Sequence, residues 1–153
     1  MLTFRELEKL PLRKVVSILA RSVFEQQIKV GRESLPKELQ HFSLAVELNG
    51  EIMNGGISQY FTNSAGEDYK QALEALSIIG AEVQKRIVLK WLSYLPANIR
   101  PGRRNEVGLY VFSKPELMKK LDCFDKEYFD SADSFYGAMV EYVKKHAKVF
   151  EIS

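Results

Sequence analysis

Residues 47–64 read E-L-N-G-E-I-M-N-G-G-I-S-Q-Y-F-T-N-S, and we expect the fold to be organised around them. A helix that carries two carboxylates, Glu47 and Glu51, is expected to end at the Asn-Gly-Gly sequence of residues 54–56, because glycine adopts positive φ at little cost. A short amphipathic segment, residues 57–61, follows at once. The sequence therefore predicts a sharp corner at which two helical segments fold back on each other, with polar side chains placed beside the bend.

The composition is that of an ordinary globular domain. The chain has 153 residues, of which 46% are hydrophobic and 27% are charged. A chain of this length buries roughly 68–70% of its unfolded surface, so we expect a single domain over residues 1–153. Lysine and arginine number 22 against 20 aspartates and glutamates, giving a net charge of +2. This balance argues against a DNA-mimicking surface and against a dedicated nucleic-acid-binding surface.

Apolar residues recur at helical spacing along the chain, and short strands at regular spacing are missing. Thr3-x-x-Glu6 is a capping-box pattern, Pro11 interrupts the helix that follows it, and Gly31 supplies a left-handed stop. Helices are expected from Phe4 to Pro11, from Leu12 to Val30 and from Pro36 to the glycine corner. Further helices are expected from Val83 to Leu95 and from Ser131 to Phe150. Capping-box patterns open two more, from Ser64 to Gly80 and from Ser113 to Leu121. The predicted fold class is all-α: a single compact bundle-like domain with about six to eight helices, some of them short.

Three stretches are expected to lie outside these helices. Residues 98–106 are predicted to form a loop, with a Pro-Gly turn signal. Residues 108–112 have a strand-like composition, and we expect them to be extended or to form one helical turn. Residues 122–130 are acidic and aromatic, and we expect an irregular conformation.

A recognisable motif runs through the glycine corner. It consists of Glu47 or Glu51, then Asn54, Gly55, Gly56, Ile57, Gln59, Tyr60, Phe61 and Asn63. This motif resembles the core motif of the DNA-mimic-protein-like (DMP-nineteen-like) family of small bacterial all-α domains of unknown function, and the resemblance spans roughly residues 35–150. It implies an all-helical fold and, in some members, a dimer. The named member presents an acidic surface to a DNA-binding regulator, which requires a carboxylate excess that this chain lacks.

The polar residues beside the corner form the candidate binding site. They are Glu47, Glu51, Asn54, Gly55, Gly56, Gln59, Tyr60 and Asn63. One interpretation is that carboxylates and amides here recognise a basic group or a peptide. The other is structural: Asn54 and Gln59 hold the backbone groups of the turn. Glu51 lies in the last helical turn, where the helix dipole disfavours negative charge, and a nearby arginine or backbone donor could offset this.

We interpret the chain as a non-enzymatic domain that binds another protein, with a homodimer left open. One alternative is a small-molecule enzyme that uses Glu47 and Glu51 as an acid–base pair. Another is weak nucleic-acid binding through the loop from Arg100 to Arg104. The sequence has no nucleophile-elbow or phosphate-loop pattern, so no catalytic residue is assigned.

No metal, cofactor or membrane site is expected. Glu38-x-x-His41 has the spacing of a di-iron ligand pair, but the second such pair is missing, since the other histidine, His146, has a valine at that offset. Cys123 is the single cysteine and cannot form an internal disulfide, which favours a reducing, cytoplasmic location. We expect no signal peptide, and the longest apolar stretch is far shorter than the ~20 residues of a membrane span.

Overall fold

The computed structural model describes residues 3–153, and these residues form helices and no strands. α1 (Phe4–Leu7) begins with the predicted capping box: the Glu6 N–H donates to the Thr3 hydroxyl oxygen, and the Thr3 N–H donates to the Glu6 carboxylate at 2.8 Å. Pro11 precedes α2 (Leu12–Val30), and Gly31 ends that helix with a φ of 83°. The first part of the chain therefore folds as its glycine and proline residues predict.

The rest of the described chain continues as helices joined by short connections. They are η1 (Arg32–Ser34), α3 (Lys37–Thr62), η2 (Ser64–Asp68), α4 (Tyr69–Ile79), α5 (Glu82–Leu92), α6 (Arg104–Phe112), α7 (Pro115–Asp130) and α8 (Ala132–Lys145), where η1 and η2 are 3-10 helices. The described residues thus contain eight α-helices in one compact domain, which confirms the predicted all-α fold.

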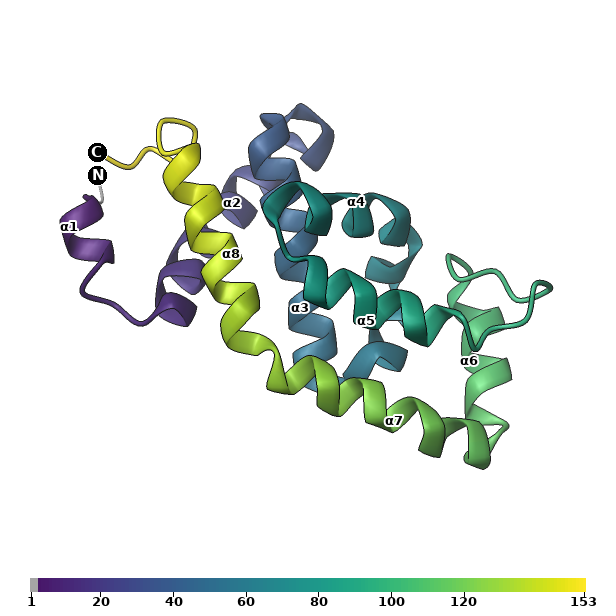
Figure 1. Cartoon of the computed structure of the whole chain (residues 1–153). Coiled ribbons are helices and arrows are strands. Elements are labelled where there is room, and N and C mark those ends of the chain that lie inside the picture. The colour runs from purple at the N-terminus through teal and green to yellow at the C-terminus, as the bar shows by residue number, and fades with distance from the viewer. Residues whose placement is uncertain (1–2) are drawn as a thin grey trace.

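α3 is the helix against which most of the others pack. It contacts α2, α4, α6 and α7, and its Phe42, Leu48 and Ile52 side chains are fully buried. α8 packs against α2, and α1 lies beside the C-terminal residues (Figure 1), where the Phe4 N–H donates to the Ser153 carbonyl at 3.0 Å. The core therefore surrounds α3, which carries the predicted glycine corner.

α3 bends sharply at its two glycines. Gly55 (φ −150°, ψ 19°) and Gly56 (φ 85°, ψ 174°) have non-helical backbone angles inside the helix. Beyond the bend, the Asn63 amide donates to the Glu51 carboxylate at 2.6 Å, although these residues are twelve apart in the sequence. A straight helix would separate them by about 18 Å. The predicted reversal is therefore confirmed, with Gly56 as the residue that requires positive φ.

The helical segment after the bend is capped by a residue from a distant helix. The Ile57 N–H, at the start of that segment, donates to Asp125 of α7 at 2.8 Å. A Cβ atom added to Gly56 would lie 2.5 Å from the other oxygen of the same carboxylate. Asp125 thus satisfies a backbone donor that the bend leaves free, and it can approach this closely because residue 56 is glycine.

Residues 122–130 are helical, so the prediction that they are irregular is wrong. They form the second half of α7, in which Leu121, Phe124 and Tyr128 recur at helical spacing. Tyr128 is fully buried and donates to Asn49 of α3 at 3.1 Å. The aromatic residues therefore fix this stretch as a helix against the core, while Asp122 and Asp130 stay exposed.

Residues 108–112 belong to α6, which corrects the prediction of an extended segment or a single turn. α6 begins at Arg104, inside the predicted loop, and spans nine residues. Val107 and Val111 are four residues apart and fully buried, so they place one side of a helix against the core. Tertiary packing therefore overrides the strand-like local composition.

Two helices start differently from the capping-box predictions. Residues 64–68 form the 3-10 helix η2, whose N-cap position is Asn63, and no side chain caps it. α7 starts at Pro115, whose ring is already set for the first helical turn, and Ser113 does not cap it.

Two helices end earlier than their apolar spacing predicts. α5 ends at Leu92 instead of Leu95, and α8 ends at Lys145 instead of Phe150. In both places the chain continues in tight turns, with Leu95 N–H donating to the Leu92 carbonyl and Val149 N–H to the His146 carbonyl. Such turns keep nearly the same side-chain spacing as a helix, so the apolar spacing continues beyond the last helical residue.

Candidate functional site

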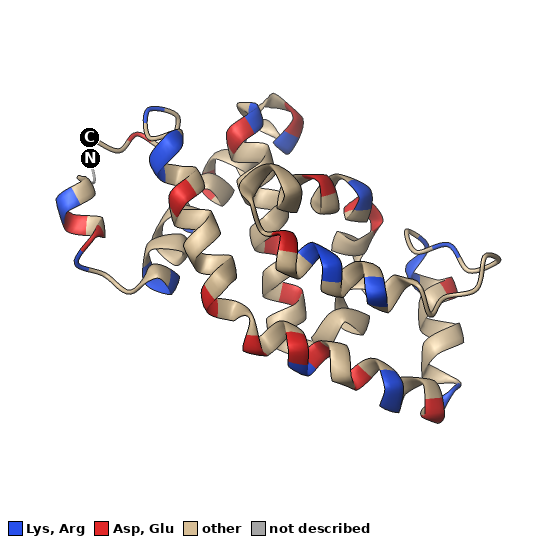
Figure 2. Cartoon of the chain, viewed as in Figure 1, with Lys and Arg blue, Asp and Glu red and all other residues tan. Residues whose placement is uncertain are grey.

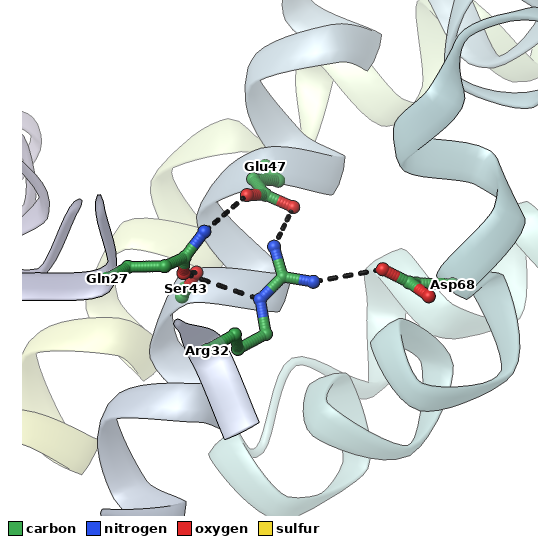
Figure 3. Close-up of polar contacts among 5 residues, drawn as sticks. All are labelled: Gln27, Arg32, Ser43, Glu47 and Asp68. Carbon is green, nitrogen blue, oxygen red and sulfur yellow. Dashed lines mark hydrogen bonds and ion pairs between the residues drawn. The ribbon is translucent and has the colours of Figure 1, made fainter. Parts of the chain in front are cut away.

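A partly buried arginine joins the segments on either side of the bend. Arg32 of η1 points its guanidinium between Glu47 of α3 and Asp68 of η2 (Figure 3), at 2.5 Å and 3.0 Å respectively. The Arg32 side chain is 18% exposed, and the Glu47 and Asp68 side chains are 27% and 48% exposed. The arrangement is a charge-assisted tie between three elements that are far apart in the sequence.

Gln27 of α2 completes this arginine network. Its side-chain amide donates to Glu47 at 3.4 Å, and its carbonyl oxygen accepts from the Arg32 Nε at 3.3 Å and from the Ser43 hydroxyl. Tyr60 is buried near the two carboxylates: burial raises the pKa of its hydroxyl first, and Asp68 and Glu47 raise it further. Tyr60 therefore stays a neutral phenol at physiological pH.

Glu51 belongs to a second cluster, which the bend creates. Gln59 donates its side-chain amide to Glu51 at 3.0 Å, and Asn63 donates to the same carboxylate oxygen at 2.6 Å. Both donors come from the segment after Gly56. These two side-chain amides, which the bend brings close, therefore offset the unfavourable interaction of the Glu51 charge with the C-terminal end of the first helical segment.

The predicted site residues fall into three groups by exposure. Asn54, Gly55 and Asn63 are exposed; Glu47, Glu51 and Gln59 are half-buried; Gly56 and Tyr60 are buried. The structure brings Glu51, Gln59 and Asn63 together, and it places Glu47 and Tyr60 around Arg32. Glu47 and Glu51 bind different partners: Glu47 contacts Gln27 and Arg32, and Glu51 contacts Gln59.

A comparison with protein families places this arrangement in a known group. The family model described as DMP19-like protein matches residues 33–146. The chain belongs to the DMP19-like protein family. No curated protein and no solved structure matches it. The DMP19-like region contains α3, the bend and the capping residue Asp125, whereas Gln27 and Arg32 lie before it. The arginine network thus joins the family region to the helix that precedes it.

Three residues of the arginine network were not predicted from the sequence: Gln27, Arg32 and Asp68. Ser43 and Glu47 are four residues apart on one helix, and this spacing does indicate a shared polar face. Arg32 and Asp68 are 36 residues apart, and their pairing depends on the path of the chain around the bend. Local spacing carries no signal for that contact.

In the arginine loop of this DMP19-like chain, residues 100–104, two of the arginines pair with carboxylates of the same chain. Glu106 accepts from the Arg100 N–H at 3.1 Å and from its guanidinium, and this hydrogen bonding raises the pKa of Arg100 and lowers the pKa of Glu106. Arg104 lies 3.8 Å from Glu67. A phosphate bound here would have to compete with both carboxylates.

The two histidines lie beside the same tyrosine. His41 Nδ1 is 3.2 Å from the Tyr142 hydroxyl, and the His146 ring centroid is 4.6 Å from that of Tyr142. Burial lowers the pKa of His41. Within residues 3–153, no group of three or more His, Cys, Asp or Glu side chains is placed to hold a metal ion. In the same range, no helix is both long enough and apolar enough to cross a bilayer.

The cap at the bend predicts a pH effect on stability. Burial raises the pKa of Asp125, against the lowering effect of its hydrogen bond from Ile57, and Asp122 raises it further. The folded chain then holds this proton at a pH where the unfolded chain has lost it, so the contribution of Asp125 to stability falls as pH rises through that interval. Asp125→Asn keeps an oxygen acceptor but does not titrate.

We therefore expect the stability of Asp125→Asn, relative to the unmodified chain, to increase as the pH is raised from about 3 to about 7. Urea denaturation of both proteins at several pH values measures the difference in their free energies of unfolding. The contributions of the other titrating groups cancel in that difference because both proteins carry them. A constant difference would show that Asp125 ionises as readily in the folded chain as in the unfolded one, and a change in the opposite direction would show that it ionises more readily when folded.

Proposed function

We propose that this DMP19-like chain is a non-enzymatic domain that binds another protein through the outer side of the α3 bend. The binding surface consists of Glu51, Asn54, Gly55 and Asn63. The observation that carries the proposal is the Glu51 carboxylate, which two amides hold in one orientation at the edge of the structure. A carboxylate fixed in this way is ready to accept hydrogen bonds from a partner.

Preorganisation is the physical reason why this surface suits binding. Ordering a flexible side chain on association costs about 0.5–1.5 kcal/mol. Glu51 has already lost that freedom to Gln59 and Asn63, and Asn54 and Gly55 beside it are exposed. A basic side chain or free backbone N–H groups on a partner therefore meet an acceptor that needs little further ordering.

Glu47 and Tyr60 have a supporting role in this proposal. Tyr60 is 1% exposed, and Glu47 is engaged by Arg32 and Gln27. They hold the segment after the bend in place and leave partner contact to the outer residues. Acidic and basic residues are interspersed over the helices (Figure 2), so the proposal does not depend on a surface of one charge sign that attracts the partner. The single cysteine, Cys123, supports a reducing, cytoplasmic setting for this role.

The test compares partner binding by the double variant Glu51→Ala, Asn54→Ala with that by a matched control. Glu74→Ala is the control, since it removes an exposed helical glutamate from α4. Affinity capture from the native host identifies proteins retained by the unmodified chain, and calorimetry then measures their dissociation constants. We expect about tenfold weaker binding for the double variant, which corresponds to about 1.4 kcal/mol, and no change for Glu74→Ala.

Circular dichroism melts establish that both variants remain folded. Equal dissociation constants for the unmodified chain and the double variant would reject the bend as the binding surface.

A further inference from the structure

A groove opens where α2, α3 and α8 meet. Its volume is about 340 Å³, and it has apolar walls. The wall residues are Val16, Ala20 and Phe24 from α2, Val46 and Gly50 from α3, and Tyr136 from α8. Apolar clefts between helices with a few placed polar groups are common binding sites.

The groove is open because its wall contains small residues where larger ones would fit. A Cβ atom added to Gly50 would meet no atom within 4 Å, and Gly50 has no positive φ that would require glycine. Glycine in the middle of a helix is less stable than alanine, because its unfolded backbone has more conformational freedom to lose. The fold therefore does not require glycine at position 50, and the lack of a side chain there leaves the groove open to a ligand.

The rim of the groove is basic. Arg13 and Arg21 line it, and no carboxylate does. The nearest acidic partner of the rim is Glu25, 3.2 Å from Arg21, but both side chains are largely exposed, at 84% for Arg21 and 60% for Glu25. Such an exposed pair contributes little to stability, so Arg21 can exchange it for a carboxylate on a ligand.

A hydroxyl group is also available on the groove wall. Asn49, which is 5% exposed, donates its side-chain amide to the Tyr136 hydroxyl oxygen at 3.3 Å and accepts from the buried Tyr128 hydroxyl at 3.1 Å. The Tyr136 hydroxyl oxygen therefore accepts a hydrogen bond from Asn49, and its O–H can donate to a group in the groove. A carboxylate or carbonyl oxygen in the groove would receive it.

We propose that this groove binds an amphipathic helix of a partner protein whose apolar side carries flanking carboxylates. The apolar side would lie between α2 and α3, and the carboxylates would face Arg13 and Arg21. The lining residues of α2 run from Arg13 to Phe24, roughly 16 Å along the helix, which matches about three turns of a docked helix.

The proposal rests on the proposed protein-binding function and adds a second contact to it. Val46, Gly50 and Asn54 follow one another at intervals of four residues, so they lie along one side of α3. Val46 and Gly50 line the groove, and Asn54 belongs to the bend surface. A partner helix in the groove therefore lies on the side of α3 that leads to Asn54.

The test uses synthetic peptides of about 18 residues, or five helical turns, with the same leucine stripe and different flanks. One peptide has glutamate flanks, one has lysine flanks and one has glutamine flanks. Titration into the ¹⁵N-labelled full chain reports both affinity and location. We expect the glutamate peptide to bind about tenfold more tightly than the lysine peptide. Its binding should weaken with added salt and shift the amide signals of Ala20, Gly50 and Tyr136.

Variants separate the groove from the rest of the surface. Gly50→Leu fills the groove and should weaken binding of the glutamate peptide about tenfold. Gly137→Leu is the matched control: Gly137 is also a helical glycine with no atom within 4 Å of an added Cβ, but it does not line the groove. The double change Arg13→Glu, Arg21→Glu should reverse the preference in favour of the lysine peptide. Dispersed spectra show whether each variant is folded.

Equal affinity for the glutamate and lysine peptides, no effect of Gly50→Leu, or signal shifts outside the groove would overturn the proposal. So would a dimer of the unmodified chain that Gly50→Leu dissociates, because a second copy would then occupy the groove. The peptides do not depend on Glu51 or Asn54. Failure of the bend variants with intact peptide binding would therefore reject the bend surface alone, and the reverse result would reject the groove alone.

Discussion

Replacing Gly56 with alanine is expected to lower the free energy of unfolding by about 2–4 kcal/mol. The backbone of Gly56 has a φ of 85° and a ψ of 174°, a region that is essentially restricted to glycine and costs other residues of order 1–3 kcal/mol. The new Cβ would also stand 2.5 Å from the Asp125 carboxylate. If Asp125 moves away, Ile57 loses its cap, at a further cost of about 0.5–2 kcal/mol.

Urea denaturation followed by circular dichroism measures this change, and Gly50→Ala is the control in the same helix. Gly50 has no positive φ and open space around it, so alanine there should raise stability by roughly 0.5–1 kcal/mol. Opposite signs at the two positions would identify the bend as the cause. A loss at Gly56 below about 0.5 kcal/mol, the range of an ordinary surface change, would show that α3 tolerates a side chain at its corner.

Arg32→Ala should have the second-largest effect, a loss of about 2 kcal/mol in the free energy of unfolding. The change leaves the half-buried carboxylates of Glu47 and Asp68 without their cation and removes one of the two donors to the Gln27 carbonyl oxygen. Breaking a fully buried ion pair costs about 3–5 kcal/mol, but the Asp68 side chain is 48% exposed and water can replace part of the interaction. Arg32→Lys should recover only part of the loss, because an ammonium group cannot bind both carboxylates in the same fork geometry.

Arg21→Ala is the matched control for Arg32→Ala. The Arg21 side chain is 84% exposed and pairs with the exposed Glu25, so its removal should change stability by less than about 0.5 kcal/mol. A double-mutant cycle of Arg32→Ala with Glu47→Gln should give a coupling energy of about 0.5–3 kcal/mol. Equal losses for the two arginines would mean that the network does not hold the bend together.

Local chemistry was sufficient to predict the helix boundaries set by glycine and proline. Gly31, Gly56 and Gly80 have positive φ where the chain leaves a helical segment, and the reversal that brings Asn63 to Glu51 follows from the glycine pair. These features depend on residues close together in the sequence. They are therefore visible before any tertiary contact is known.

Contacts between distant residues were not predictable in this way. Residues 122–130 looked irregular because their helix is fixed by Tyr128 against Asn49, 79 residues away. The cap on Ile57 comes from Asp125, 68 residues away. Both contacts require the packing of α7 on α3, which no single-helix pattern specifies. The candidate binding site stays a prediction, and the division of its residues between the two clusters depends on that packing.

The central claim is that α3 bends sharply at Gly55–Gly56 and thereby brings Asn63, just after its end, to Glu51, which lies before the bend. Nuclear Overhauser spectroscopy of the unmodified, ¹⁵N- and ¹³C-labelled chain tests this most directly. We predict cross-peaks between the Asn63 side-chain amide protons and the Glu51 γ protons, which a 2.6 Å nitrogen–oxygen contact brings close together. Absence of these cross-peaks, with unbroken helical connectivities through residues 54–57, would contradict the account, because a straight helix keeps the two side chains about 18 Å apart.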